Sequence, residues 1–419
     1  MEFIIEDGKL KKCYEDRGRG SIKIVIPDNV ISIEDGAFYS CQRIKSITIP
    51  DGVKSIGKQA FDGCTALESI NIPDNVREIG PDAFEECSAL KSINIPDSVI
   101  TIGDGAFSGC EGLADKDGFV IIRNVLYGYF GECSAISIPD GVKTISSRAF
   151  YYSKGVKCIK IPDSVTIIEN YAFIDCFNLE EVYIPDSVTS IGNSAFSNCF
   201  NLKEVYIPDS VTSIGNSAFY NCSSLYNVIL SDNITNIRDS TFTFCTALES
   251  AILPQKLKII ESNAFQNCKN LKNIKISDSV TEIGSNAFKG CEKLADEDGF
   301  VIIRNTVYDY FGNDSEITIP DSVTTISQSA FGRCDTIQSV TIPESVKSIE
   351  EFSFAKCVSL KSVTISNRTT NIDDSAFDYC ESLKKLTICG CTFDTTQHNI
   401  SIPHFLAIMR NKSSQQYET

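Results

Sequence analysis

The chain has 419 residues, with 55 acidic and 38 basic side chains and a formal net charge of -17 at pH 7. A chain this acidic lacks the positive surface that binds phosphate backbones, so nucleic acid is excluded as an expected partner. Its two histidines, His398 and His404, lie near the C-terminus, so the rest of the chain has no imidazole for general-base or nucleophile chemistry, and we expect no enzyme.

The first predicted element is an N-terminal capping hairpin in residues 1–20. Residues 3–14 read FIIEDGKLKKCY, a loose copy of a two-strand unit that recurs twice further along the chain. Residues 1–8 show no basic region followed by an apolar stretch, so no secretory signal is expected. No window approaches the roughly 18–20 apolar residues of a membrane span, so we expect no membrane insertion.

A repeat of 23 residues follows this hairpin. Thirteen of the 18 cysteines share one register within it: Cys41, Cys64, Cys87, Cys110, Cys176, Cys199, Cys222, Cys245, Cys268, Cys291, Cys334, Cys357 and Cys380. A phenylalanine precedes each of these cysteines by three residues, and 11 of the 13 prolines are also in register. Self-similarity at a fixed period of this length indicates a stack of identical structural units.

Each repeat is predicted to contain one short strand that ends at a proline. Residues 177–199 and 200–222 read FNLEEVYIPDSVTSIGNSAFSNC and FNLKEVYIPDSVTSIGNSAFYNC, and they differ at two of 23 positions. Val205 and Ile207 alternate with an outward Tyr206, which is the pattern of a half-buried strand, and Pro208 cannot continue the ladder. Residues 216–219 are expected to form one helical turn. A single repeat buries too little apolar surface to fold alone, so stability belongs to the array.

Two insertions of 20 residues interrupt the repeats. They begin LADKDGFVIIRN at residue 113 and LADEDGFVIIRN at residue 294, and both are expected to form hairpins. The predicted division of one continuous solenoid is therefore 1–20 hairpin cap, 21–113 repeats 1–4, 114–136 insertion, 137–294 repeats 5–11, 295–317 insertion, 318–388 repeats 12–14, 389–409 C-terminal cap and 410–419 flexible tail.

The pattern LxxVxIPxxVxxIxxxAFxxC resembles the BspA-type leucine-rich repeat family over about residues 21–388, in 14 copies. The resemblance implies an all-β-rich repeat solenoid: a right-handed coil with parallel short strands, short helical turns and β-hairpin insertions. It also implies a cell-surface or secreted adhesin that binds host or neighbouring-cell proteins. The absence of an export signal favours the cytoplasm instead, so localisation stays open.

The cysteine column is interpreted as a ladder of buried, reduced thiols, because free cysteine is among the most buried residue types. Disulfides and metal clusters are the alternatives. Cys389 and Cys391, with His398 and His404, form a weak candidate zinc site, although their Cys-x-Cys spacing is tighter than usual. We therefore predict no metal and no cofactor.

The sequences DKDG at residue 115 and DEDG at residue 296 are interpreted as hairpin turns rather than calcium loops, because the other ligands are missing.

The outward strand position carries large side chains in the middle of the stack, at Tyr183, Tyr206, Ile229 and Ile252. An exposed apolar stripe of this kind often marks a partner surface, whereas simple preference of these residues for strands is the alternative. Phe177 and Phe200 either flank this stripe or belong to the core.

The leading hypothesis is a monomeric, non-catalytic scaffold that binds a protein partner, such as a host extracellular protein, over this stripe. A glycan-binding surface protein and an intracellular interaction array are the competing hypotheses.

Overall fold

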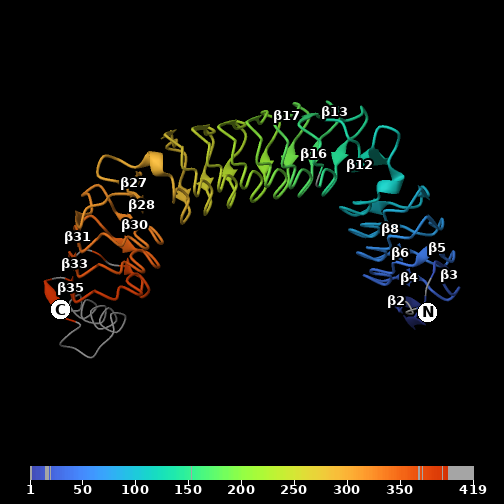
Figure 1. The fold of residues 1–419 in the computed structure, drawn as a ribbon, viewed down its shortest axis with the longest axis horizontal. Helices are drawn as coiled ribbons and strands as arrows, with labels where there is room; N and C mark the ends of the chain where they lie inside the picture. Colours follow the sequence, from blue (N-terminus) through green and yellow to red (C-terminus); the bar gives the residue numbers. More distant parts are fainter. Residues whose placement is uncertain are drawn as a thin grey trace. The chain divides into compact units, whose positions relative to one another are not determined.

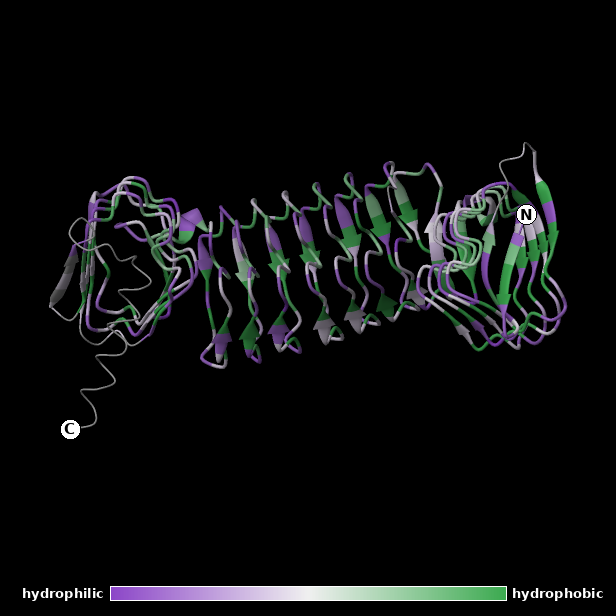
Figure 2. Cartoon of the chain, turned by 90° about the horizontal axis from the view of Figure 1, so that it is seen from below, coloured by the Kyte–Doolittle hydropathy of each residue, from purple (hydrophilic) through white to green (hydrophobic). Residues whose placement is uncertain are grey.

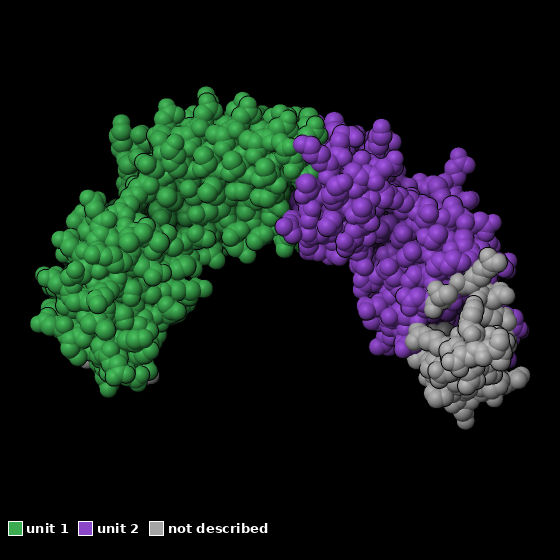
Figure 3. All heavy atoms as spheres, turned by 180° about the vertical axis from the view of Figure 1, so that it is seen from behind, with its two compact units in different colours: residues 1–223, 229–234 green, residues 224–228, 235–419 purple. Residues whose placement is uncertain are grey.

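The computed structural model describes residues 2–14, 18, 20–151, 153–366, 369, 371–388 and 390–394. The chain divides into two compact units, Met1–Ser223 with Ile229–Ile234, and Ser224–Val228 with Thr235–Thr419 (Figure 3). Each unit is a stack of coils built from short strands (Figure 1). Within the described residues, the helices are two short 3-10 turns, η1 (Glu111–Leu113) and η2 (Glu292–Leu294). The predicted fold class, a β-rich repeat solenoid, is confirmed.

The first unit opens with two sheets that run along the stack. The first is six-stranded and has the order β1 (Glu2–Glu6), β2 (Lys9–Tyr14), β4 (Ser32–Ile33), β6 (Ser55–Ile56), β8 (Glu78–Ile79) and β10 (Thr101–Ile102). The second is four-stranded, with β3 (Ile22–Val25), β5 (Ile44–Thr48), β7 (Ser69–Asn71) and β9 (Ser92–Asn94). Successive coils pair in parallel, as in Ile33↔Ile56.

Both sheets restart after the first insertion. One has the order β11 (Phe119–Ile122), β12 (Val125–Tyr129), β14 (Thr144–Ile145), β16 (Ile167–Ile168), β18 (Ser190–Ile191) and β20 (Ser213–Ile214). The other begins with β13 (Ala135–Ser137), β15 (Cys158–Lys160), β17 (Glu181–Tyr183) and β19 (Glu204–Tyr206). Strand β21 (Asn227–Ile229) contains a boundary between the two units.

The second unit repeats this plan. Its early strands are β22 (Asn236–Ile237), β24 (Ile259–Ile260) and β26 (Glu282–Ile283) in one sheet, and β23 (Ser250–Ile252) and β25 (Asn273–Ile274) in another. Two sheets follow the second insertion. The first has the order β27 (Phe300–Ile303), β28 (Thr306–Tyr310), β30 (Thr325–Ile326), β32 (Ser348–Ile349) and β34 (Asn371–Ile372). The second has the order β29 (Glu316–Thr318), β31 (Ser339–Ile342), β33 (Ser362–Ile365), β35 (Lys385–Ile388) and β36 (Cys391–Asp394).

Each coil therefore carries two strands, whereas the sequence predicted one. The additional strand follows the proline turn, as Ser213–Ile214 does after Pro208, and it pairs in parallel with Ser190–Ile191 of the preceding coil. Its apolar residue, Ile214, is buried, and β-branched residues of this kind fit a pleated sheet. Figure 2 shows the apolar segments recurring at the same place in successive coils.

Residues 216–219 form tight turns rather than the predicted helical turn. Ser217 and Asn221 have φ of 56° and 59°, which breaks a right-handed helical path. Their neighbours bond to the adjacent coil instead: the N–H of Ser194 donates to the carbonyl of Asn216 at 2.8 Å, and the N–H of Phe196 donates to that of Ala218 at 2.7 Å. Some backbone groups thus bond between coils, and others close local turns, as the N–H of Tyr220 does by donating to the carbonyl of Ser217 at 3.0 Å.

Phenylalanine rings form two ladders inside the first unit, from Phe38 to Phe107 and from Phe150 to Phe219, one on each side of the insertion. Phe173, Phe196 and Phe219 stack with centroids 4.8 Å and 5.2 Å apart, and all three are fully buried. The cysteines line up beside them. The thiol of Cys199 donates to the carbonyl of Phe173 at 3.2 Å, and burial raises the pKa of this thiol well above its usual value. No cysteine whose side chain is described forms a disulfide.

We expect fewer than about a third of the thiols to react with a thiol reagent in the native protein, because buried thiols are inaccessible and protonated. The exposed Cys133 should react first. Ellman's reagent added to native and to urea-unfolded protein measures the two fractions. Rapid reaction of most thiols in the native protein, or a large fall in Tm on adding a reductant, would contradict the buried, reduced ladder.

Three of the hairpins in the described part of the chain share one design. Strands β1 and β2, β11 and β12, and β27 and β28 pair antiparallel, and the register shifts at corresponding places, between Ile4 and Ile5, Val120 and Ile121, and Val301 and Ile302. The insertion aspartates cap turns as expected: Asp115 Oδ1 accepts the N–H groups of Asp117 and Phe119, both at 2.9 Å. Asp296 does the same for Asp298 and Phe300.

Candidate protein-interaction surface

The candidate surface in the first unit is the outward face of strands β17, β19 and β21. Tyr183 and Tyr206 are 65% and 56% exposed, and Ile229 is 37% exposed. Val205 and Ile207, on either side of Tyr206, are buried, so the alternation of the strand directs this tyrosine away from the core. The N–H of Ile207 donates to the carbonyl of Ile229 at 2.9 Å, which fixes neighbouring coils at strand spacing. The structure thus brings together three of the four predicted residues.

The fourth predicted residue, Ile252, belongs to the second unit. It lies on β23 with 61% exposure, and its neighbour Ala251 is buried. Within its own unit, Ile252 is therefore an outward apolar side chain on a strand, as the sequence pattern indicated.

Ion pairs lie at one border of this face. Glu180 accepts from Lys157 at 3.2 Å and from Lys203 at 2.5 Å, and the hydrogen bonds from Lys203 and Lys157 lower the pKa of Glu180. Both lysines are exposed, so the pairs contribute little to stability. Glu181 and Glu204 share the outward face of β17 and β19 with the two tyrosines, so the stripe offers acidic as well as aromatic side chains.

Phe177 and Phe200 form a second aromatic feature. Their rings stack with centroids 5.2 Å apart, and Phe200 is partly exposed. Phe200 is therefore not a core residue. It lies in the turn that precedes strand β19, the strand that carries Tyr206.

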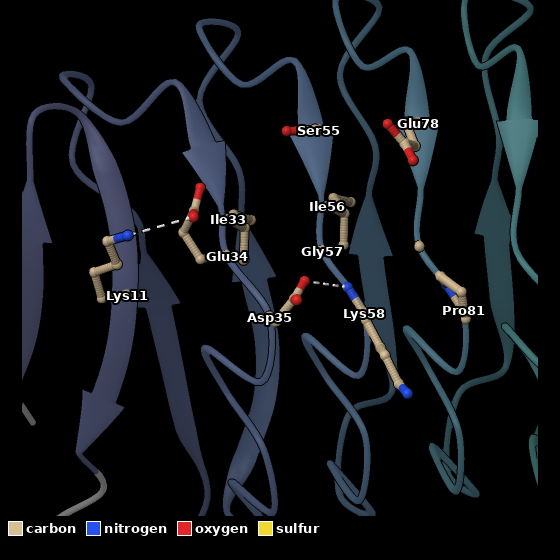
Figure 4. A pocket seen from close by; sticks show the side chains of 11 residues that line it. Lys11, Ile33, Glu34, Asp35, Ser55, Ile56, Gly57, Lys58, Glu78 and Pro81 are labelled. Carbon is tan, nitrogen blue, oxygen red and sulfur yellow. Dashed lines mark hydrogen bonds and ion pairs between the residues drawn. The ribbon is translucent and has the colours of Figure 1, made fainter.

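The first unit also has a hollow of 510 Å³ between successive coils near its N-terminus (Figure 4). Several of its polar groups are paired with one another: Lys11 lies 3.5 Å from Glu34, and the N–H of Lys58 donates to Asp35 Oδ1 at 2.7 Å. A hydrogen bond from Ser32 lowers the pKa of Glu34. Ser32 Oγ donates to Glu34 Oε1 at 2.6 Å, so Glu34 is bonded to both Ser32 and Lys11.

The weak zinc candidates cannot be placed. Cys389, His398 and His404 lie outside the described residues, and for Cys391 the structure describes the strand but not the side chain. Among the residues that are described, no three His, Cys, Asp or Glu side chains are grouped to hold a metal ion. The described helices also include none with the length and apolar character needed to span a bilayer.

Comparison with known proteins agrees with this architecture. The chain is similar to a leucine-rich repeat protein from Eubacterium ventriosum ATCC 27560, with 30% identity and a TM-score of 0.50 over 64% of this chain and 82% of that one. It is also similar to a leucine-rich repeat protein from Bacteroides ovatus ATCC 8483, with 27% identity, a TM-score of 0.42 and 92% and 97% coverage. A third similar structure is a leucine rich cell surface protein from Faecalibacterium prausnitzii A2-165, with 26% identity, a TM-score of 0.38 and 93% coverage of both chains.

A search of curated proteins finds no match. The family model of the BspA type leucine rich repeat region, in 6 copies, matches residues 11–133, 120–246, 166–295 and 301–401. These matches extend over most of the chain and follow the repeats that build both stacks of coils. The chain therefore belongs to the BspA-type leucine-rich repeat family.

Proposed function

We propose that this chain is a non-catalytic scaffold whose first unit binds a protein partner through Tyr183, Tyr206 and Ile229. The observation that carries the proposal is the exposure of two large tyrosines on neighbouring parallel strands of a rigid sheet. Tyrosine supplies a wide contact area at low conformational cost, and it is enriched among residues that dominate binding energy. The family membership supports a partner on a host or neighbouring cell, so adhesion is the most concrete form of this function.

Glycan binding is a second candidate for the same residues. Two exposed aromatic rings on adjacent strands could each stack on a sugar ring, so exposure alone does not separate the two ligand classes. An intracellular interaction array would use the same stripe with a different protein. A binding measurement against both proteins and glycans therefore distinguishes the ligand classes.

We expect the double variant Tyr183→Ala with Tyr206→Ala to bind its partner at least about tenfold more weakly than the wild type, because hot-spot truncations cost about 2 kcal/mol or more. The measurement is a screen of the full chain on immobilised matrix proteins and on a glycan array, followed by titration of the ligands found.

Tyr39→Ala is the matched control, because Tyr39 is an exposed tyrosine in a turn elsewhere in the first unit. Its affinity should equal that of the wild type. Equal binding by the double variant would reject the stripe as the docking surface, and binding to glycans alone would replace the protein partner with a sugar.

A further inference from the structure

The first insertion leaves an open strand edge in the first unit. Strand β13 pairs with β15 on one side, with Ala135↔Cys158 and Ser137↔Lys160 in register, and it is the end strand of its sheet. The preceding sheet ends separately at β9. The insertion therefore interrupts the sheet and exposes the outer edge of β13.

The exposed edge offers unpaired backbone groups. The carbonyl of Ser134 accepts from the N–H of Cys158 at 3.0 Å, and the N–H of Ile138 donates to the carbonyl of Lys160 at 3.0 Å. In a parallel ladder, alternate residues face the neighbouring strand, so the peptide groups of Ala135 and Ser137 point to the open side. Both residues are exposed, and within residues 20–151 the structure shows no hydrogen bond to those outward groups.

A hollow of 620 Å³ runs beside this edge. The hairpin contributes Phe119, Tyr129 and Phe130 to its lining, and β13 contributes Ala135, Ile136 and Ser137. Phe130 is partly exposed, whereas Phe119 and Tyr129 are buried. Phe130 therefore presents aromatic surface to an apolar side chain on an added strand.

The lining of the hollow is acidic. It includes the exposed carboxylates of Glu111, Asp115, Asp117 and Glu132 and one basic side chain, Lys116. Asp115 already caps the turn, and Lys116 lies 3.9 Å from Asp117, so the excess of negative charge persists after these contacts. Such a rim attracts a cationic segment and disfavours an acidic one.

We propose that an extended peptide with basic side chains binds here as an additional strand on β13. Its backbone pairs with Ala135 and Ser137, one alternating set of side chains enters the aromatic hollow, and its cationic side chains meet the acidic rim. Strand addition at an open edge is a general mode of peptide recognition. This site is separate from the Tyr183 stripe and goes beyond the function proposed above.

The second insertion supplies natural substitutions for testing the site. At the positions of Lys116, Glu132 and Ala135, it carries Glu297, Asn313 and Glu316. The same hairpin folds with these residues, since β27 and β28 pair as β11 and β12 do. Glu132→Asn is therefore a charge-removing variant that this hairpin design tolerates.

The probe is a fluorescent eight-residue peptide of alternating lysine and valine, titrated against the full chain by anisotropy. A glutamate-valine peptide and a lysine-valine peptide with every peptide bond N-methylated are the controls. We expect the lysine-valine peptide to bind and to slow hydrogen exchange in residues 134–138. The N-methylated peptide has the same charge but cannot complete the ladder, so it should bind about tenfold more weakly.

Two variants complete the test. Ser137→Pro removes one outward N–H and leaves the β15 ladder intact, so affinity should fall about tenfold, and Glu132→Asn should lower it about two- to fivefold. Tyr183→Ala with Tyr206→Ala should not change it, which separates this site from the stripe. Equal binding of the N-methylated peptide, or exchange protection elsewhere, would overturn the proposal. If Ser137→Pro lowers Tm, the N-methylated peptide and Glu132→Asn decide the outcome.

Discussion

Replacing Phe196 with alanine should lower the free energy of unfolding by about 3–5 kcal/mol, the range for truncating a buried phenylalanine. Phe196 is fully buried and stacks almost parallel on Phe173 and Phe219, with interplanar angles of 7° and 0°. The cavity would therefore weaken contact with the coil on each side. Because coupling between coils stabilises a solenoid, the loss should appear as a lower urea midpoint in circular dichroism.

Phe200→Ala is the matched control for this experiment. Phe200 also stacks on the equivalent ring of the preceding coil, Phe177, at 5.2 Å, but it is partly exposed. Its loss should cost about 0.5–1.5 kcal/mol, the value of a single aromatic pair. Similar losses for the two variants would show that the buried ladder contributes no more than the surface pair.

The repeat period was sufficient to predict the core. A phenylalanine that recurs every 23 residues must occupy the same place in each coil, and the stacked rings of Phe173, Phe196 and Phe219 show this directly. The cysteine column follows from the same argument. The outward stripe was also predictable, because Tyr206 alternates with Val205 and Ile207.

The left-handed turns were only partly predictable. The position before each repeat cysteine holds residues that tolerate positive φ in many coils, namely Gly63, Gly109, Asn198, Asn221, Asn267 and Gly290. However, Phe244 and Lys356 adopt φ of 61° and 63° at the same position. Each donates its N–H to the next coil at 2.8 Å, to the carbonyls of Gln266 and Asp378. Pairing between coils imposes the conformation there, and no local residue preference reveals it.

Contacts across the first insertion could not be predicted at all. Arg148 reaches Glu85 Oε1 at 2.8 Å although 63 residues separate them, and its guanidinium lies 3.8 Å from Asp82. It also lies 5.9 Å from the ring centre of Tyr171. The repeat pattern fixes neighbours within a run of coils, but the insertion interrupts that pattern, so the partner of Arg148 depends on how the hairpin packs.

Burial of Glu85 makes stability depend on pH, and the Arg148 contact reduces this dependence. Burial raises the pKa of Glu85 from 4.5 to about 7, Arg148 opposes the shift, and Asp82, Asp62 and Glu86 add to it. The folded state therefore holds a proton that the unfolded state has released between about pH 4.5 and 7, so stability falls as pH rises through this window. The full difference corresponds to about 3.5 kcal/mol. Asp82 and Asp62 have raised pKa values, chiefly through burial, and act in the same direction.

We expect Glu85→Gln to flatten this dependence, because glutamine keeps the shape of the side chain and has no charge to bury. Urea unfolding of wild type and variant at pH 5 and pH 8 measures this dependence: the wild type should lose stability between the two pH values, and the variant should lose about 2–3 kcal/mol less.

Arg148→Ala should make stability depend more steeply on pH, with a cost of about 1–3 kcal/mol at pH 8, where Glu85 is ionised, and a smaller cost at pH 5. In the double variant the Arg148 cost at pH 8 should shrink, since its main partner is neutral. A cost of Arg148→Ala that is the same at both pH values would show that this arginine acts through packing alone.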